Sequence, residues 1–157
     1  MRTGLGFDVH RLEPDRKLIL GGIEIPYHLG LKGHSDGDVI LHAISDAIAG
    51  ALAEDDIGTT FPDTDESISG IKSDRILDHY YKILVLRKAR ILNIDIVIVA
   101  ENPKLKKWYE LMKKNIATLL DIDISQIGIK AKTMEGLGEI GQGKAIACLA
   151  SILIDMR

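Results

Sequence analysis

The chain has 157 residues, with 20 Lys and Arg against 23 Asp and Glu, for a formal net charge of −3. With 46% hydrophobic residues, a chain of this length can bury about 70% of the surface that it exposes when unfolded. The mildly acidic balance excludes the basic surface that nucleic acid or an anionic membrane requires, so we expect neither partner. We expect residues 1–157 to form a single domain.

Three features predict the compartment. The longest nearly apolar run, residues 145–154, is about half of the ~20 residues that a membrane-spanning helix needs. The N-terminal segment carries charged residues where an export signal would have its apolar core. The single cysteine, Cys148, excludes an internal disulfide and a zinc site built from cysteines. We therefore expect a cytoplasmic protein.

Residues 2–11 alternate as in a β-strand, which divides their side chains between two faces. One face is apolar and carries Leu5, Phe7 and Val9. The other face carries glycines, which leave open space, and polar residues: Gly4, Gly6, Asp8 and His10. Further along, residues 17–20 and 23–25 flank Gly21-Gly22, which predicts a tight hairpin.

The remaining elements are predicted in chain order. Apolar spacing predicts a helix over 38–52, which ends at an acidic loop. A second helix is expected from Ser73, as its N-cap, to Arg90, and a third over 105–120, after Pro103. Strands are expected over the apolar segments 94–100, 127–133 and 145–154.

The apolar strands predict the architecture. Residues 96–99 and 145–154 are apolar on both faces, so the sheet needs a cover on both sides. Three helices can cover only one face, and the simplest cover for the other is a second copy of the chain. We therefore expect an α+β fold with α/β-type layers: a mixed sheet with helices on one face, whose other face is buried in a homo-oligomer.

The first candidate site combines a strand and a helix. Asp8 and His10 are two residues apart on a strand and point the same way, as two metal ligands would, although a solvent-facing polar strand gives the same pattern. On the helix, Asp38, His42 and Asp46 form one polar stripe, which is either an exposed acidic side or a buried functional one. Taken together, the residues indicate an Asp8, His10 and His42 site with an open fourth position, typical of catalytic zinc.

Other segments suggest contacts with phosphate and sugar. His34 and Ser35 directly precede the helix, where backbone amides could hold a phosphate; ordinary capping by Ser35 or Asp36 is the alternative. The acidic loop over 56–65 has no helical or strand period, and it is either simply solvated or suited to a polyol or ribose. Thr133 and Glu135 are candidates for a phosphate and a magnesium ion.

The glycine-rich segment 136–141 matches the spacing G-x-G-x-x-G of dinucleotide-binding proteins. In that class of site a helix follows the glycines and an acidic residue follows about 20 residues on. Here a strand is expected over 145–154 and the chain ends before such an acid, so we reject a dinucleotide site.

Five segments closely resemble the 2-C-methyl-D-erythritol 2,4-cyclodiphosphate synthase family, in the expected order and over essentially the whole chain. They are GFDVHRL (6–12), HSDGDVILHAISDAI (34–48), DIGTTFPDTD (56–65), AENPKL (100–105) and KAKTMEGLGEIGQGKAIA (130–147). The resemblance implies a homotrimer with active sites between subunits. It also implies a reaction: the 2-phosphate of 4-diphosphocytidyl-2-C-methyl-D-erythritol 2-phosphate attacks the β-phosphorus of its own diphosphate, closing a cyclic diphosphate and expelling CMP.

The resemblance also implies residue roles. Zinc would be held by Asp8, His10 and His42, and a Mg²⁺ or Mn²⁺ ion on the substrate diphosphate by Glu135. His34 and Thr133 would stabilise the transition state. Contacts with the cytidine diphosphate substrate would involve Asp8, Val9, His10, His34, Ser35, Asp56, Ile57, Gly58, Phe61, Pro62, Asp63, Thr64, Asp65, Ala100, Glu101, Asn102, Pro103, Lys104, Leu105, Lys106, Lys132, Thr133, Met134 and Glu135.

The last segment departs from the family pattern. Glu139, Gln142 and Lys144 stand where many members have Phe, Arg and Glu, and Lys132 and Met134 replace threonines. Some relatives hold an isoprenoid diphosphate on the trimer axis through that Phe and Arg, so we do not expect the same binding here.

Two other functions fit parts of the pattern. A zinc-dependent phosphohydrolase would use the same Asp/His/His site with water as the nucleophile, and would release a linear monophosphate. A trimeric nucleotide-binding regulator would keep the cytidine pocket but would not need Asp8, His10 and His42. Analysis of the reaction product distinguishes the phosphohydrolase from the cyclising synthase. Analysis of bound metal distinguishes the regulator from the synthase.

Overall fold

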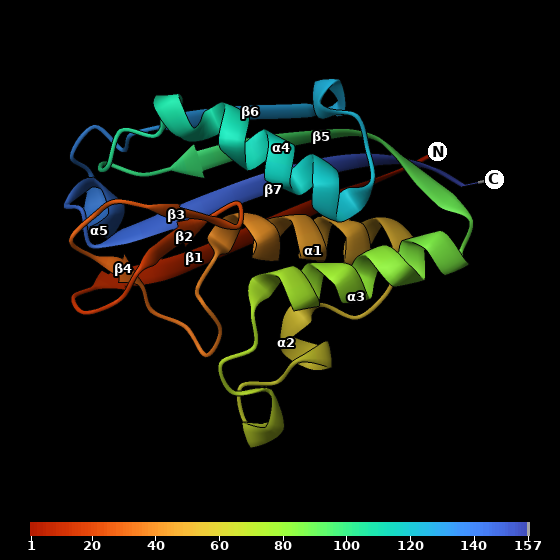
Figure 1. Cartoon of the computed structure of the whole chain (residues 1–157), viewed down its shortest axis with the longest axis horizontal. Helices are drawn as coiled ribbons and strands as arrows, with labels where there is room; N and C mark the ends of the chain where they lie inside the picture. Colours follow the sequence, from red (N-terminus) through yellow and green to blue (C-terminus); the bar gives the residue numbers. More distant parts are fainter. Residues whose placement is uncertain (157) are drawn as a thin grey trace.

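A mixed five-stranded sheet, in the order β4-β1-β7-β5-β6, forms the centre of the computed structural model, which describes residues 1–156 (Figure 1). Its strands are β1 (Arg2–Glu13), β4 (Gly30–Leu31), β5 (Ala89–Val99), β6 (Ile127–Lys132) and β7 (Ala145–Met156). Strands β5 and β6 are parallel, and the other neighbours are antiparallel. The predicted mixed sheet is confirmed.

Helices lie on one side of this sheet (Figure 1). The longer ones are α1 (Val39–Leu52), α3 (Ser73–Leu86) and α4 (Tyr109–Leu120). Short helical turns are α2 (Ile57–Thr60), α5 (Gly138–Gly141) and the 3₁₀ segments η1 (Glu66–Ile68), η2 (Lys106–Trp108) and η3 (Ile124–Gln126). Within residues 1–156, no helix has the length and apolar character needed to cross a bilayer.

Two predicted boundaries around the second helix were wrong. The helix ends at Leu86 rather than Arg90, because Lys88 adopts a left-handed conformation (φ 54°) and β5 starts at Ala89. Ser73 is the first residue of α3 and not its N-cap; Lys72 takes that position without a side-chain hydrogen bond. The Ser73 side chain has other partners, which are described below.

Strand β1 packs unusually close to helix α1. A Cβ atom on Gly6 would lie 1.8 Å from the carbonyl oxygen of Ala43, and one on Gly4 would lie 1.8 Å from that of Ala47. The expectation that these glycines leave open space was therefore wrong, because the helix backbone fills that space. The close approach brings His42, the residue before Ala43, towards Asp8 on the same face of β1.

The other face of β1 is uncovered in the chain described here. Leu5, Phe7 and Val9 are 68%, 56% and 46% exposed, and Leu149, which pairs with Phe7 across β1 and β7, is 36% exposed. The predicted division of side chains between the two faces of β1 is confirmed. Monomeric soluble proteins seldom expose a contiguous apolar patch of this kind.

Asp38 joins helix α1 to the predicted hairpin, whose strands β2 (Leu18–Leu20) and β3 (Ile23–Ile25) flank Gly21-Gly22. Its carboxylate caps α1 by accepting the N–H groups of Ile40 and Leu41. It also accepts the N–H groups of Gly21 and Gly22 at 3.0 and 2.6 Å. Burial raises the pKa of Asp38 to about 6 despite these bonds. Its place in the polar stripe is therefore structural.

We expect Asp38→Ala to lower the free energy of unfolding by about 3 kcal/mol, since it removes a helix cap and leaves buried N–H groups without acceptors. Urea denaturation measures this change. Asp123→Ala is the matched control, because Asp123 caps the exposed turn η3 and should change stability little. Equal effects of the two substitutions would contradict the role of Asp38.

Candidate metal centre and active-site cavity

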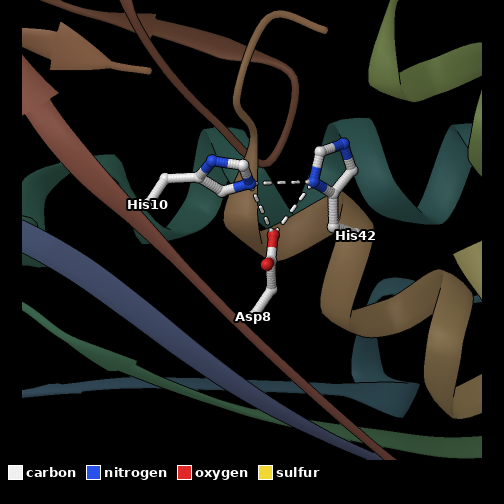
Figure 2. Close-up of side chains that lie close together, drawn as sticks. All are labelled: Asp8, His10 and His42. Carbon is white, nitrogen blue, oxygen red and sulfur yellow. Dashed lines mark hydrogen bonds and ion pairs between the residues drawn. The ribbon is translucent and has the colours of Figure 1, made fainter. Parts of the chain in front are cut away.

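The predicted ligands Asp8, His10 and His42 lie together on the inner face of β1 and the start of α1 (Figure 2). Asp8 Oδ2 is 2.9 Å from both His10 Nε2 and His42 Nδ1, and the two nitrogens are 3.4 Å apart. Tetrahedral zinc with bonds of ~2.0–2.1 Å places its ligands about 3.3 Å apart. One carboxylate oxygen and two imidazole nitrogens at this spacing fit zinc well.

The two histidines change the acidity of Asp8. Burial would raise the pKa of Asp8, but the hydrogen bonds and charges of His10 and His42 outweigh burial and hold that pKa well below its usual range. Burial would lower the pKa of His10, but its contacts with Asp8 raise it instead. The carboxylate is thus kept in the ionised form that binds a cation.

The ring nitrogens that face away from the candidate metal position also have partners. His10 Nδ1 lies 2.5 Å from the carbonyl oxygen of Lys32, to which it donates. His42 Nε2 contacts the hydroxyls of Ser35 and Ser73. Such contacts orient the imidazoles of metal sites and are typical of them. Sequence reasoning missed Lys32 and Ser73, because neither is near a ligand in the chain.

A cavity of about 720 Å³ opens beside the three ligands. Its wall contains many of the residues that the family resemblance assigns to substrate: Asp8, His10, His34, Ser35, Ile57, Gly58, Phe61, Pro62, Asp63 and Asp65. His34 lies across from the acidic loop, with Nε2 3.7 Å from a carboxylate oxygen of Asp63. Asp46 also lines the cavity, and burial raises its pKa.

The segment before α1 does not cap the helix, so the capping alternative for Ser35 and Asp36 was wrong. Asp38 is the cap, while the Ser35 hydroxyl accepts the N–H of Gly37 at 3.1 Å and Asp36 binds Ser73. Arg16, which also lines the cavity, holds the segment by donating to the carbonyl oxygens of Gly33 and Ser35 at 3.3 and 3.0 Å. Ser35 thus lines the cavity without capping the helix.

The acidic loop is more ordered than its sequence indicates. Its first part forms α2, which Asp56 caps by accepting the N–H of Thr59 at 2.8 Å. Asp65 caps η1 in the same way through Ser67. The expectation of no helical structure in this loop was wrong, because these aspartates stabilise single turns that are too short to show a period.

The other candidate residues form a second group, at the ends of the parallel strands β5 and β6. The N–H of Ala100 donates to Lys132 O at 2.9 Å, and the N–H of Met134 donates to Glu101 at 3.1 Å. The Thr133 hydroxyl lies 3.3 Å from a carboxylate oxygen of Glu135. Among the described residues, none from 100–106 or 132–135 lines the cavity at the metal ligands.

Val9 lies on the outer face of β1, away from Asp8 and His10. The glycine-rich segment contains the short helix α5 and is followed by strand β7, so it lacks the long helix of a dinucleotide site. Glu139 in this segment forms an ion pair at 3.3 Å with Lys144, which lies just before β7.

The fold and the site define an α+β protein with a candidate metal centre at the wall of a cavity. The model of the YgbB family matches residues 1–155, and the chain belongs to this family. A curated relative from Clostridioides difficile (strain 630), named 2-C-methyl-D-erythritol 2,4-cyclodiphosphate synthase, is 51% identical over 154 residues, or 98% of this chain and 96% of the relative.

Two solved structures have the same fold. The bifunctional IspDF from Campylobacter jejuni matches 99% of this chain with a TM-score of 0.95 and 42% identity. This chain spans only 42% of that bifunctional protein. The IspF–CDP complex from Plasmodium falciparum matches with a TM-score of 0.88 and 40% identity, over 99% of this chain and 96% of the other.

Proposed function

We propose that this chain converts 4-diphosphocytidyl-2-C-methyl-D-erythritol 2-phosphate to 2-C-methyl-D-erythritol 2,4-cyclodiphosphate and CMP, in isoprenoid biosynthesis. Membership of the YgbB family and the shared name of its curated relatives support this lyase-class activity. The observation that carries it is the Asp8, His10 and His42 cluster at the wall of the cavity. The reaction is a phosphoryl transfer within one molecule, so it depends on positioning and charge stabilisation.

The proposed metal ligands form one end of the site. Asp8, His10 and His42 would hold one zinc ion per subunit, which would supply positive charge to polarise the β-phosphate. His34 and Ser35 would contact the phosphates, because both line the cavity at the start of α1. The residues of α2 and the following loop would contact the ribose and the methylerythritol.

The second group of residues would hold the leaving group. Thr133 would stabilise the transition state together with His34, and Glu135 would hold a Mg²⁺ or Mn²⁺ ion, which would supply positive charge to the substrate diphosphate. One carboxylate suits Mg²⁺, which takes most of its ligands from water and substrate phosphates. Residues 100–106 would bind cytosine, and a cavity of about 400 Å³ lined by Pro103, Lys104 and Lys106 supports this assignment.

A homotrimer would bring the two groups together. Leu5, Phe7 and Val9 form an exposed apolar face that a neighbouring subunit would bury. Among residues 1–156, the Thr133 group does not line the cavity at the metal cluster, which supports active sites completed between subunits. We assign the protein to the cytoplasm, where its free, buried Cys148 would stay reduced.

The direct test is to incubate the purified protein with the cytidyl substrate, Zn²⁺ and Mg²⁺ and to follow the phosphorus NMR spectrum. Formation of the cyclic diphosphate together with CMP is the expected result. A linear monophosphate would instead identify a phosphohydrolase. Binding of the nucleotide without any product would identify a regulator.

We expect Thr133→Ala to lower kcat about 100-fold with little change in KM, because a contact made mainly in the transition state contributes to kcat. Steady-state kinetics with the cytidyl substrate measure both constants. Thr118→Ala is the matched control: the Thr118 hydroxyl is exposed on α4 and donates to Lys114 O. A rise in KM alone would make Thr133 a ground-state contact and reject its proposed role.

A further inference from the structure

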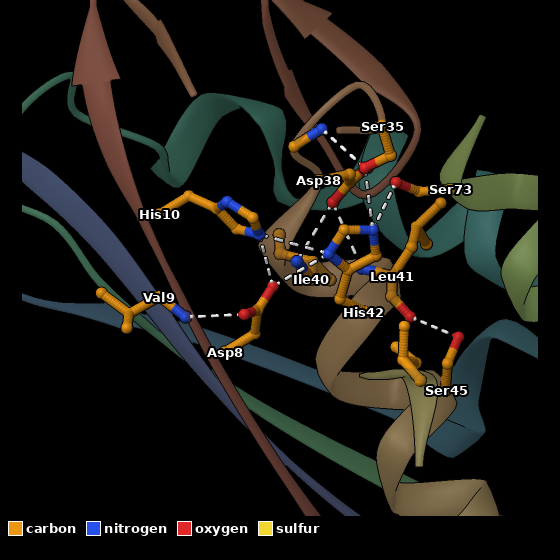
Figure 3. A network of polar contacts seen from close by, with 12 residues as sticks. Asp8, Val9, His10, Ser35, Asp38, Ile40, Leu41, His42, Ser45 and Ser73 are labelled. Carbon is orange, nitrogen blue, oxygen red and sulfur yellow. Dashed lines mark hydrogen bonds and ion pairs between the residues drawn. The ribbon is translucent and has the colours of Figure 1, made fainter. Parts of the chain in front are cut away.

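The His42 ring has a second polar environment, on the side that faces away from Asp8 and His10. Its Nε2 atom lies 2.9 Å from the hydroxyl of Ser73 and 3.2 Å from the hydroxyl of Ser35 (Figure 3). Ser73 is fully buried in the first turn of α3, whereas His42 belongs to α1. A hydrogen bond between α3 and α1 therefore involves a candidate metal ligand directly.

The hydrogen-bond donors in this contact can be assigned. The Ser73 hydroxyl is hydrogen bonded to Asp36 Oδ1, and the backbone N–H of Ser73 donates to Asp36 Oδ2 at 3.3 Å. An ionised carboxylate only accepts, so the single hydroxyl proton of Ser73 points to Asp36. Ser73 Oγ then has only lone pairs for His42, and the proton of the contact must be on His42 Nε2.

Ser35 is compatible with the same assignment. Its hydroxyl oxygen already accepts the N–H of Gly37 at 3.1 Å and has a second lone pair for His42 Nε2. In a neutral imidazole only one nitrogen carries a proton. When a metal ion takes Nδ1, the atom that faces Asp8 and His10, this proton stays on Nε2.

We propose that Asp36 and Ser73 form a hydrogen-bonded relay that positions His42, holding its proton on Nε2 and presenting the bare Nδ1 to the metal. This inference rests on the proposed function, because the metal ion is the group that the relay serves. Neither Asp36 nor Ser73 is among the described residues that line the cavity. Both are positioning residues that act through His42.

The relay requires residues from three segments to meet. Asp36 lies in the loop before α1, Ser73 starts α3, and 31 positions separate Ser73 from His42. A purely structural role would limit the Asp36–Ser73 bond to joining the loop to α3. Loss of that bond would then lower stability without changing the affinity for a metal or the position of the His42 proton.

Zinc affinity distinguishes the two roles. We expect Ser73→Ala to weaken Zn²⁺ binding about 10- to 100-fold, the usual effect of losing an outer partner of a metal ligand. Competition with a chelating dye on the full chain measures it. Ser45→Ala is the matched control, because Ser45 is also fully buried but its hydroxyl donates to Leu41 O instead. This control should bind Zn²⁺ as the unmodified protein does.

The His42 proton is observed on the unmodified chain with Zn²⁺ bound, because in the metal-free chain Nδ1 also faces the Asp8 carboxylate at 2.9 Å. NMR should show a His42 Nε2–H signal that is protected from exchange with water, and Ser73→Ala should remove that protection. Asp36→Asn keeps a neutral acceptor for the Ser73 hydroxyl, so it should lower Zn²⁺ affinity less than Ser73→Ala does. It replaces Ser73→Ala as the test if that variant does not fold.

Two results would overturn the relay: unchanged Zn²⁺ affinity in folded Ser73→Ala, or a His42 Nε2–H that exchanges freely with water in the unmodified, Zn²⁺-loaded chain. Failure of the proposed function has a different signature. If the unmodified protein binds Zn²⁺ but forms no cyclic diphosphate, the proposed function is wrong and the relay stands; if it binds no Zn²⁺, the metal centre and the relay fail together.

Discussion

His42→Ala is expected to lose tight Zn²⁺ binding by more than about 100-fold, beyond the effect of changing an outer partner, and to lose cyclisation with it. The substitution removes one of three candidate ligands, while the apolar positions of α1 that pack on the sheet are unchanged. The variant should therefore stay folded. Metal analysis after dialysis and a circular dichroism melt measure the two properties separately.

The matched control for this substitution is His28→Ala. His28 is exposed and contacts Tyr27, with ring centroids 4.5 Å apart, far in the chain from the candidate ligands. It should retain full Zn²⁺ binding and full activity. Full Zn²⁺ occupancy in His42→Ala would reject the ligand assignment.

Phe7→Asp is expected to prevent assembly and to abolish activity, because it places a charge at the centre of the exposed apolar face of β1. If a neighbouring subunit buries that face, the unpaired carboxylate strongly disfavours association. Loss of activity follows because the proposed active site is completed between subunits. Sedimentation velocity of the variant and of the unmodified protein measures the assembly.

Leu86→Asp is the control for adding a charge at an exposed apolar residue. Leu86 is 81% exposed at the end of α3, on the helical side of the sheet. This variant should sediment and react as the unmodified protein does. A stable and fully active monomer of the unmodified chain would contradict both the buried face and the shared active site.

The metal ligands could be predicted because simple periods place them. Asp8 and His10 are two residues apart on a strand, and the apolar spacing of α1 shows which side of the helix carries His42. A strand period and a helix period together are enough to nominate three ligands. Their distances to one another depend on how α1 packs against β1, which no period encodes.

Other features could not be predicted because they depend on tertiary contacts. Ser73 has the residue type and position of a helix cap, and only the packing of α3 against α1 turns its hydroxyl to His42. Asp38 looked like part of a functional stripe, but the hairpin at Gly21-Gly22 folds over it and binds it. In both cases the partner is distant in the sequence.

The contact between β1 and α1 has a further consequence for the metal centre. Because Gly4 and Gly6 bring a strand backbone against a helix backbone, main-chain atoms limit how closely the two elements approach. Asp8 and His42 extend from these two backbones, so their spacing does not depend on how large side chains fill the rest of the core. Exchanges among leucine, isoleucine and valine elsewhere in the core can thus change stability while the spacing of Asp8 and His42 persists. A larger residue at Gly4 or Gly6 would instead push the strand and the helix apart and change that spacing.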